Sequence, residues 1–340
     1  MKVAVIDGQQ TTATFTDLDD ALTWVDQHGQ PDAVVHRVVH GADRTGPVIL
    51  DDAEVDLLAE LDEFAPLHQP PSLAAIARTR KALPEVAQWA CFDTSFHQTI
   101  PAPARTYALP DRLRERVRRY GFHGMSHAYA SRRMTELAPQ ANRVLVAHLG
   151  GGQSLCGVKD GASLSTTMGF TPSDGLVMST RSGTVDGSAI AWLGANSTED
   201  LARVLESESG LVGLCGEKDL RVIIDRAGQG DAAAAFALAV YRQRLIECAG
   251  ATVAAIGGLD AIVFTGGIGE NMPAIRSMLV DGLEWLGARI TPGPEAGAQE
   301  ITADGSGVRT FIVHAREDLQ MVNDVRMQAD HTFHPPPPSR

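Results

Sequence analysis

Two glycine-rich turns, each directly after a run of apolar residues, most constrain how this chain can fold. Arg143–Leu149 (RVLVAHL) predicts a buried strand that runs into Gly150–Gly152, and a further strand follows through Cys156–Lys159. Ala261–Thr265 predicts another buried strand, which enters Gly266–Gly269 ahead of a helix. Glycine lets backbone N–H groups approach an oxyanion, and a helix N-terminus adds a favourable dipole. The two turns therefore predict an α/β chain with phosphate-binding loops.

Length, charge and cysteine usage exclude several classes of protein. A chain of 340 residues predicts two domains, and a hydrophobic content of 44% supplies both cores. The net charge of −13 argues against a nucleic-acid-binding surface. Four scattered cysteines without a C-x-x-C pair predict reduced thiols. The N-terminus carries no signal-peptide pattern, and the longest apolar run, 232–256, is interrupted by charges, so we expect a cytoplasmic protein without a membrane span.

Apolar periodicity places the remaining elements. We expect strands at 2–7, 11–16, 33–39, 86–92 and 309–314, and helices at 17–28, 51–64, 72–83, 231–256, 273–286 and 317–327. The C-terminal residues 331–340 (HTFHPPPPSR) predict a disordered tail, because prolines cannot donate backbone hydrogen bonds.

Isolated charged residues within apolar or glycine-rich runs are the candidate functional groups. Arg37 lies inside the strand HRVVHG, where it needs an anionic partner, either a ligand or an internal salt bridge. Arg181 (MSTRSG) poses the same question, and Asp93 directly follows a strand. His123 and His127 stand four residues apart, but no H-E-x-x-H pattern or nearby third ligand supports a zinc site.

These motifs, in this order, resemble the acetate kinase family. The resemblance extends from Val35 to the last helix, and several of its blocks are long and distinctive. The matching blocks are HRVVHGAD (36–43), FAPLHQPPSLAAI (64–76), FDTSFHQTIP (92–101), RRYGFHGMSHAYAS (118–131), HLGGGQS (148–154), STTMGFTPSDGLVMSTRSG (165–183), SGLVGLCGEKDLR (209–221) and DAIVFTGGIGEN (260–271).

The resemblance implies an α/β fold of two ribonuclease-H-like domains, as in actin-like ATPases, with a cleft that closes over ATP and Mg²⁺ (or Mn²⁺). It implies reversible phosphoryl transfer between ATP and a short carboxylate such as acetate or propionate, and a homodimer formed through the second domain. The expected domains are residues 1–105 with 318–330, shortened relative to the family, and residues 106–317, which bind nucleotide and dimerise.

Site residues follow by matching motif positions. The resemblance assigns the carboxylate and the transferring phosphoryl group to Arg37 and Arg181, assigns stabilisation of that phosphoryl to His123, and assigns orientation of substrate and metal-bound groups to Asp93. Glu317 matches the family's magnesium-positioning acid. The small apolar pocket wall corresponds to Val39, Leu67, Phe122 and Pro172. The nucleotide-binding positions are His148, Gly150, Gly151, Gly152, Asp219, Leu220, Arg221, Gly267, Ile268, Gly269, Glu270 and Asn271.

The N-terminal turn departs from the family pattern. Asp7 stands where the family has asparagine, and Thr14 stands where it has lysine. Asp7 with Gly8 resembles the Asp-Gly-Thr turn of the wider superfamily, which binds Mg²⁺; the alternative is a phosphate loop that has decayed. The segment before HRVVHG is short, so at least one strand of the first sheet should be missing. Two hypotheses result: an active kinase, or a regulatory homologue that binds nucleotide or acyl phosphate without efficient turnover.

Overall fold

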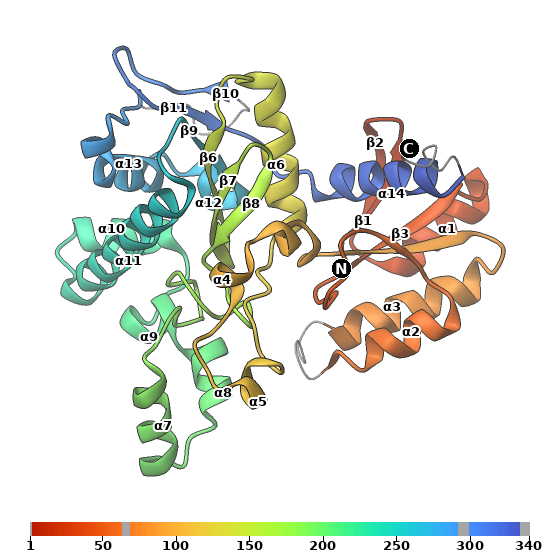
Figure 1. Ribbon diagram of the computed structural model, residues 1–340, viewed down its shortest axis with the longest axis horizontal. Coiled ribbons are helices and arrows are strands. Elements are labelled where there is room, and N and C mark those ends of the chain that lie inside the picture. The colour runs from red at the N-terminus through yellow and green to blue at the C-terminus, as the bar shows by residue number, and fades with distance from the viewer. Residues whose placement is uncertain (1, 63–68, 292–298, 334–340) are drawn as a thin grey trace. The chain divides into compact units, whose positions relative to one another are not determined.

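The computed structural model describes residues 2–62, 69–291 and 299–333, and it divides the chain into two compact units (Figure 1). Unit 1 contains the residues up to 98, residues 124–129 and the C-terminal segment from Arg316. Unit 2 contains residues 99–123 and 130–315. The chain thus first leaves unit 1 at Gln98, whereas the sequence-based boundary was 105.

Unit 1 is built on a three-stranded sheet of order β3–β5–β4. Strand β5 pairs in parallel with β3 and antiparallel with β4. Successive β5 side chains point to opposite faces, so Phe92 packs with Leu58 and Ile76 on one face, while Trp89 packs with Val325 on the other. The elements of unit 1 are β1 (Val3–Asp7), β2 (Gln10–Phe15), α1 (Leu18–His28), β3 (Ala33–Val38), β4 (Val48–Ile49), α2 (Asp52–Ala59), α3 (Gln69–Ala82), β5 (Ala87–Phe92) and α14 (Glu317–Phe333).

The N-terminal hairpin forms a sheet of its own. Strands β1 and β2 pair antiparallel, with an irregularity in register between Val5 and Ile6. Gly8, with φ +60°, makes the turn, and its carbonyl oxygen accepts a hydrogen bond from Arg326 of α14. Within the described residues the hairpin does not join the β3–β5–β4 sheet.

The C-terminal helix is longer than the sequence predicted. Helix α14 begins at Glu317, as expected, but continues to Phe333. The sequence predicted a disordered tail from residue 331, whereas the structure places residues 331–333 in the helix. Residues 334–340 lie outside the described part of the chain.

Unit 2 is built on a six-stranded mixed sheet of order β10–β11–β9–β6–β7–β8. The strands β6, β9 and β11 run parallel, and β7 and β8 continue from β6 as an antiparallel meander. The long helix α11 covers one face, with Tyr241 and Leu245 buried in a core that also contains Leu145 and Phe264. The strands are β6 (Arg143–Leu149), β7 (Gln153–Lys159), β8 (Ala162–Thr166), β9 (Ala261–Thr265), β10 (Gln299–Glu300) and β11 (Arg309–Ile312).

The helices of unit 2 begin at side-chain caps wherever a loop carboxylate precedes them. Asp231 accepts hydrogen bonds from Ala233 N and Ala234 N at the start of α11, and Asp186 caps α7 in the same way. The helices are α4 (Ala102–Arg105), α5 (Asp111–Arg114), α6 (Gly124–Leu137, whose first residues belong to unit 1), α7 (Gly187–Asn196), α8 (Leu201–Arg203), α9 (Gly210–Cys215), α10 (Leu220–Gly228), α11 (Ala232–Ile256), α12 (Gly266–Asn271) and α13 (Pro273–Gly282).

All four cysteines are free thiols. Over the residues that the structure describes, α11 included, no helix is both long and apolar enough to span a bilayer. In the same residues no three His, Cys, Asp or Glu side chains gather as a metal site, and the His127 ring packs edge-on against His97 at 5.6 Å between centroids.

Candidate active site

Three charged side chains of unit 1 form a connected cluster. Because β3 and β5 are parallel and in register, Arg37 lies opposite Cys91, and Asp93 follows one residue after the end of β5. Arg37 donates from Nε and Nη2 to the two Asp93 oxygens, at 3.0 and 2.7 Å. Its Nη1 lies 3.1 Å from Oε2 of Glu317, at the start of α14. The structure thus brings together three predicted site residues that are far apart in sequence.

This cluster carries a net charge of −1 when all three groups are ionised. The Asp93 side chain is 3% exposed, whereas that of Arg37 is 41% exposed. The Asp93 carboxylate raises the pKa of the Arg37 guanidinium above its ordinary value. Burial raises the pKa of the Glu317 carboxyl, although Arg37 opposes that shift. The partly exposed guanidinium of Arg37 is suited to bind an anion. The Glu317 carboxyl, which is costly to ionise when buried, is suited to bind a cation, because a nearby positive charge favours its ionised form.

The N-terminal turn places its polar groups unevenly. Asp7 is exposed and lies opposite Gln10 across the hairpin. Thr11 Oγ1 accepts a hydrogen bond from Arg316 at 2.6 Å and donates to Asp318 at 3.3 Å. Thr14, at the position of the family's lysine, is exposed on β2.

In unit 2 the two glycine turns meet. Strands β6 and β9 are parallel, with His148 opposite Thr265, so both chains enter their turns at the same sheet edge. Gly266 has φ +77°, and a Cβ there would lie 2.7 Å from Leu149 O. Only glycine fits this crossing. Gly150 N donates to Gly152 O at 3.1 Å, which closes the first turn.

A histidine and an arginine converge on the first of these turns. A Cβ at Gly152 would lie 3.3 Å from His123 Nε2 and 3.4 Å from Arg181 Nη1. His123 Nδ1 lies 2.9 Å from Ser154 Oγ, and its ring centroid is 4.2 Å from that of His148. When Ser154 donates to Nδ1, the ring hydrogen lies on Nε2 and faces the turn. His123 also has φ +57°, uncommon for a residue with a side chain.

Arg181 is held without an acidic partner. Its Nη1 donates to Pro172 O at 3.1 Å and lies 3.7 Å from the Met178 sulfur. Among the described residues no carboxylate reaches it within ion-pair distance. Burial lowers the pKa of its guanidinium, partly offset by Glu206. An incompletely neutralised guanidinium beside glycine N–H groups is the arrangement that an oxyanion requires.

In the second glycine turn, the Glu270 carboxylate bonds to groups of its own unit. Glu270 Oε1 accepts hydrogen bonds from Gly266 N and Ala315 N, both at 2.9 Å, and Oε2 lies 2.7 Å from His314 Nδ1. Gly267 and Asn271 are exposed, with Asn271 Nδ2 donating to Gly267 O. Glu270 therefore stabilises the turn from within.

The remaining predicted nucleotide positions differ in exposure. Asp219 accepts hydrogen bonds from the backbone N and the guanidinium of Arg221, which lowers the pKa of Asp219 to about 2. Both lie at the surface at the start of α10. Leu220 is 1% exposed and belongs to the hydrophobic core of unit 2, with Ile223 one helical turn later.

The predicted carboxylate-pocket residues are spread over both units. Val39 is half-buried in unit 1, whereas Phe122, 1% exposed, and Pro172 belong to unit 2. Leu67 lies outside the described residues. Ser154 received no role from the sequence, although it ends the HLGGGQS block, and its contact with His123 required the β6–β7 pairing to become visible.

The chain is similar in sequence and in structure to known acetate and propionate kinases. A model of the acetokinase family matches residues 2–323. The acetate kinase of Clavibacter michiganensis subsp. michiganensis is 41% identical over 330 residues, covering 91% of this chain and 82% of that protein. The crystal structure of Porphyromonas gingivalis acetate kinase aligns with a TM-score of 0.84 at 33% identity, covering 91% of this chain and 83% of that one. A propionate kinase from Francisella tularensis subsp. tularensis SCHU S4 aligns with the same TM-score at 35% identity, covering 90% and 82%.

Proposed function

The chain belongs to the acetokinase family, and from that premise we propose that it transfers the γ-phosphoryl group of ATP to acetate or propionate, reversibly and in line. The observation that carries the proposal is the convergence of His123 and Arg181 on the Gly152 turn. Arg181 has no ion-pair partner within the described residues, so a phosphoryl group would supply the missing negative charge.

The reaction needs positioning and charge neutralisation more than acid–base chemistry. A carboxylate oxygen attacks the γ-phosphorus while the bond to the β–γ bridging oxygen breaks, which leaves ADP and the acyl phosphate. An ionised carboxylate has no proton to lose, so no general base is required. We assign Arg181 and His123 to the equatorial oxygens of the transferring group, where charge is spread in the transition state. Arg37, held by Asp93, binds the anionic acceptor.

Divalent metal suits the acidic cluster of unit 1. The two carboxylates of Asp93 and Glu317 face one guanidinium, that of Arg37, so the cluster has an excess of one negative charge. Carboxylate oxygens are also the ligands that Mg²⁺ prefers. We propose that Glu317, with Asp7 as a second acid, helps to hold Mg²⁺ (or Mn²⁺). The ion would neutralise phosphate charge, and Asp93 would orient the bound groups.

Acyl hydroxamate formation tests the proposal. Purified protein is incubated with acetate, propionate or butyrate and with ATP or pyrophosphate as donor, and acyl phosphate is trapped with hydroxylamine. We expect product with ATP, and more with acetate or propionate than with butyrate, since each methylene changes discrimination by about 1–3 kcal/mol. No product with any pair, together with calorimetric binding of ADP, would contradict turnover and support the nucleotide-binding homologue.

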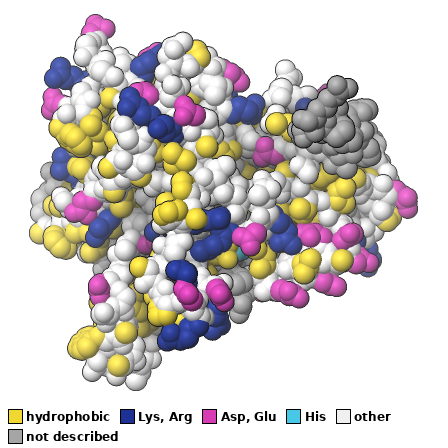
Figure 2. All heavy atoms as spheres, in the orientation of Figure 1, with side chains coloured by type: hydrophobic (Ala, Val, Ile, Leu, Met, Phe, Trp, Pro, Cys, Tyr) yellow, Lys and Arg dark blue, Asp and Glu magenta, His cyan; other side chains and the backbone are white. Residues whose placement is uncertain are grey.

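We also propose a homodimer that buries α7. This helix (GSAIAWLGAN) is apolar, but none of its residues is buried; Trp192 is 64% and Leu193 39% exposed. Figure 2 shows hydrophobic side chains at the lower end of the view, where Figure 1 labels α7. An apolar helix that touches the short helix α8 but keeps most of its side chains exposed is suited to pack against a second copy.

Replacing Trp192 with glutamate should convert the dimer to a monomer, because two buried carboxylates would face each other across a symmetric interface. Light scattering after size exclusion should read twice 36.2 kDa for the wild type and 36.2 kDa for the variant. Trp285→Glu is the matched control, since Trp285 is 73% exposed but lies elsewhere in unit 2. A monomeric wild type, or a dimeric Trp192→Glu variant, would contradict this interface.

A further inference from the structure

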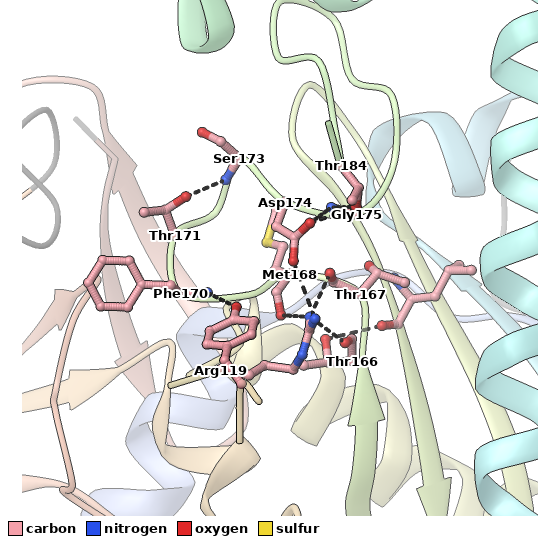
Figure 3. Close-up of polar contacts among 12 residues, drawn as sticks. Arg119, Thr166, Thr167, Met168, Phe170, Thr171, Ser173, Asp174, Gly175 and Thr184 are labelled. Carbon is pink, nitrogen blue, oxygen red and sulfur yellow. Dashed lines mark hydrogen bonds and ion pairs between the residues drawn. The ribbon is translucent and has the colours of Figure 1, made fainter. Parts of the chain in front are cut away.

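In the segment Met168–Gly175 of unit 2, here the Pro172 loop, one arginine, Arg119, contacts both ends of the loop (Figure 3). The loop follows β8, has no helix or strand of its own, and carries Pro172, whose carbonyl oxygen accepts the hydrogen bond from Arg181. Arg119 lies beneath it in the close-up, with its guanidinium directed at the loop. Neither residue composition nor the motif positions assigned Arg119 a role.

Arg119 holds the start of the loop through backbone carbonyls. Its Nη1 lies 3.2, 2.9 and 2.8 Å from the carbonyl oxygens of Thr166, Thr167 and Met168. The backbone beyond Arg119 adds two further bonds, because Tyr120 N and Gly121 N both donate to Gly169 O, at 3.0 and 3.2 Å. The segment around Arg119 and the start of the loop are therefore tied together at successive residues.

The same guanidinium holds the end of the loop through Asp174. Arg119 Nη2 lies 3.3 Å from Asp174 Oδ2, and the two side chains are 23% and 26% exposed. Asp174 Oδ1 accepts hydrogen bonds from Thr184 Oγ1 at 2.6 Å and from Gly175 N at 2.9 Å. One planar fork thus joins both ends of the loop, a geometry that a lysine ammonium cannot reproduce.

Glycines make the close packing possible. A Cβ at Gly169 would lie 2.4 Å from Asp174 Oδ2 and 2.7 Å from the Tyr107 hydroxyl, which itself accepts a hydrogen bond from Phe170 N. Gly175 has φ +96°, and a Cβ there would lie 2.7 Å from Thr167 O. The loop therefore has little room to shift while Arg119 and Asp174 remain paired.

We propose that Arg119 is a positioning residue that sets the place of Pro172, and with it the carboxylate pocket and the orientation of Arg181. This inference rests on the proposed function, because it makes the Pro172 loop the part of unit 2 that receives the acceptor acid. In this role Arg119 acts through the loop, with Asp174 as its partner.

Steady-state kinetics of Arg119→Lys test the proposal. The variant keeps the charge but loses the fork, so kcat/KM for the carboxylate should fall by about tenfold or more, while KM for ATP stays within about twofold. The ratio of acetate to propionate turnover should move toward one, because a displaced Pro172 no longer shapes the pocket. Asp174→Asn should act in the same direction, and the double variant should be no worse than the poorer single variant.

Arg143→Lys is the matched control. Arg143 also pairs with an aspartate, Asp260, and donates to a backbone carbonyl, Gly257 O, but it lies away from the loop, so the KM values of this variant should not change. Hydrogen exchange supplies a readout that does not depend on turnover: a peptide covering 168–175 should exchange faster in Arg119→Lys than in the wild type or in Arg143→Lys.

Unchanged exchange in the loop, or equal changes in the KM values for carboxylate and ATP, would overturn the inference and leave Arg119 a residue of general stability. A wild type that phosphorylates none of the acids would overturn the proposed function and the pocket role with it, whereas faster exchange in the variant would still establish that Arg119 holds the loop.

Discussion

Replacing Arg181 with alanine is expected to lower kcat by about three to five orders of magnitude, the range in which arginines that stabilise phosphoryl transfer act. The reason is local: Arg181 has no carboxylate partner among the described residues, and it converges with His123 Nε2 on the Gly152 turn. The KM for ATP should change little, because the interaction becomes strong only as charge spreads over the transferring oxygens.

The control for this experiment is Arg203→Ala. Arg203 also belongs to unit 2, but its guanidinium pairs with Glu208 at the surface and is 56% exposed. Its loss should leave kcat unchanged. Arg181→Lys should recover only part of the rate, since an ammonium cannot donate to Pro172 O and to two phosphoryl oxygens in one plane. A fully active Arg181→Ala protein would show that the phosphoryl group is held elsewhere.

Strongly patterned segments could be predicted from the sequence. The buried strands β6 and β9 and the capped helix α11 match their expected positions within one residue, because continuous apolar runs and an Asp231 cap are local signals. Strand β8 was missed. Its sequence, ASLST, is short and largely polar, and only its pairing with β7 makes it a strand.

Contacts between distant segments could not be predicted in the same way. From the sequence, Arg37 could either bind a ligand or form an internal salt bridge. The parallel register of β3 and β5 brings it close to Asp93, with which it pairs. The role of Arg119 cannot be predicted from the sequence, because its partners are mostly backbone carbonyls, which leave no residue pattern. Leu220, a predicted nucleotide-binding position, lies with Ile223 in the hydrophobic core of unit 2, a contact that depends on how α10 packs.

Replacing Arg37 with methionine should cost both stability and activity, and a second substitution separates the two. Asp93 is 3% exposed, and both its oxygens accept hydrogen bonds from Arg37, so the variant leaves a buried carboxylate without its partner and beside Glu317. We expect a loss of about 3 kcal/mol in the free energy of unfolding, toward the lower end for broken buried pairs because Arg37 is partly exposed. Turnover should fall by about a thousandfold or more.

The double variant Arg37→Met/Asp93→Asn should regain most of the lost stability, since it removes the unpaired charge, but none of the activity. Arg143→Met is the control for stability: its partner Asp260 is 24% exposed, against 3% for Asp93, so the loss of this pair should change the free energy of unfolding far less. Urea denaturation measures the first quantity and hydroxamate formation the second. Recovery of turnover in the double variant would mean that Arg37 serves only as the counter-ion of Asp93, and the acceptor carboxylate would then need another cation.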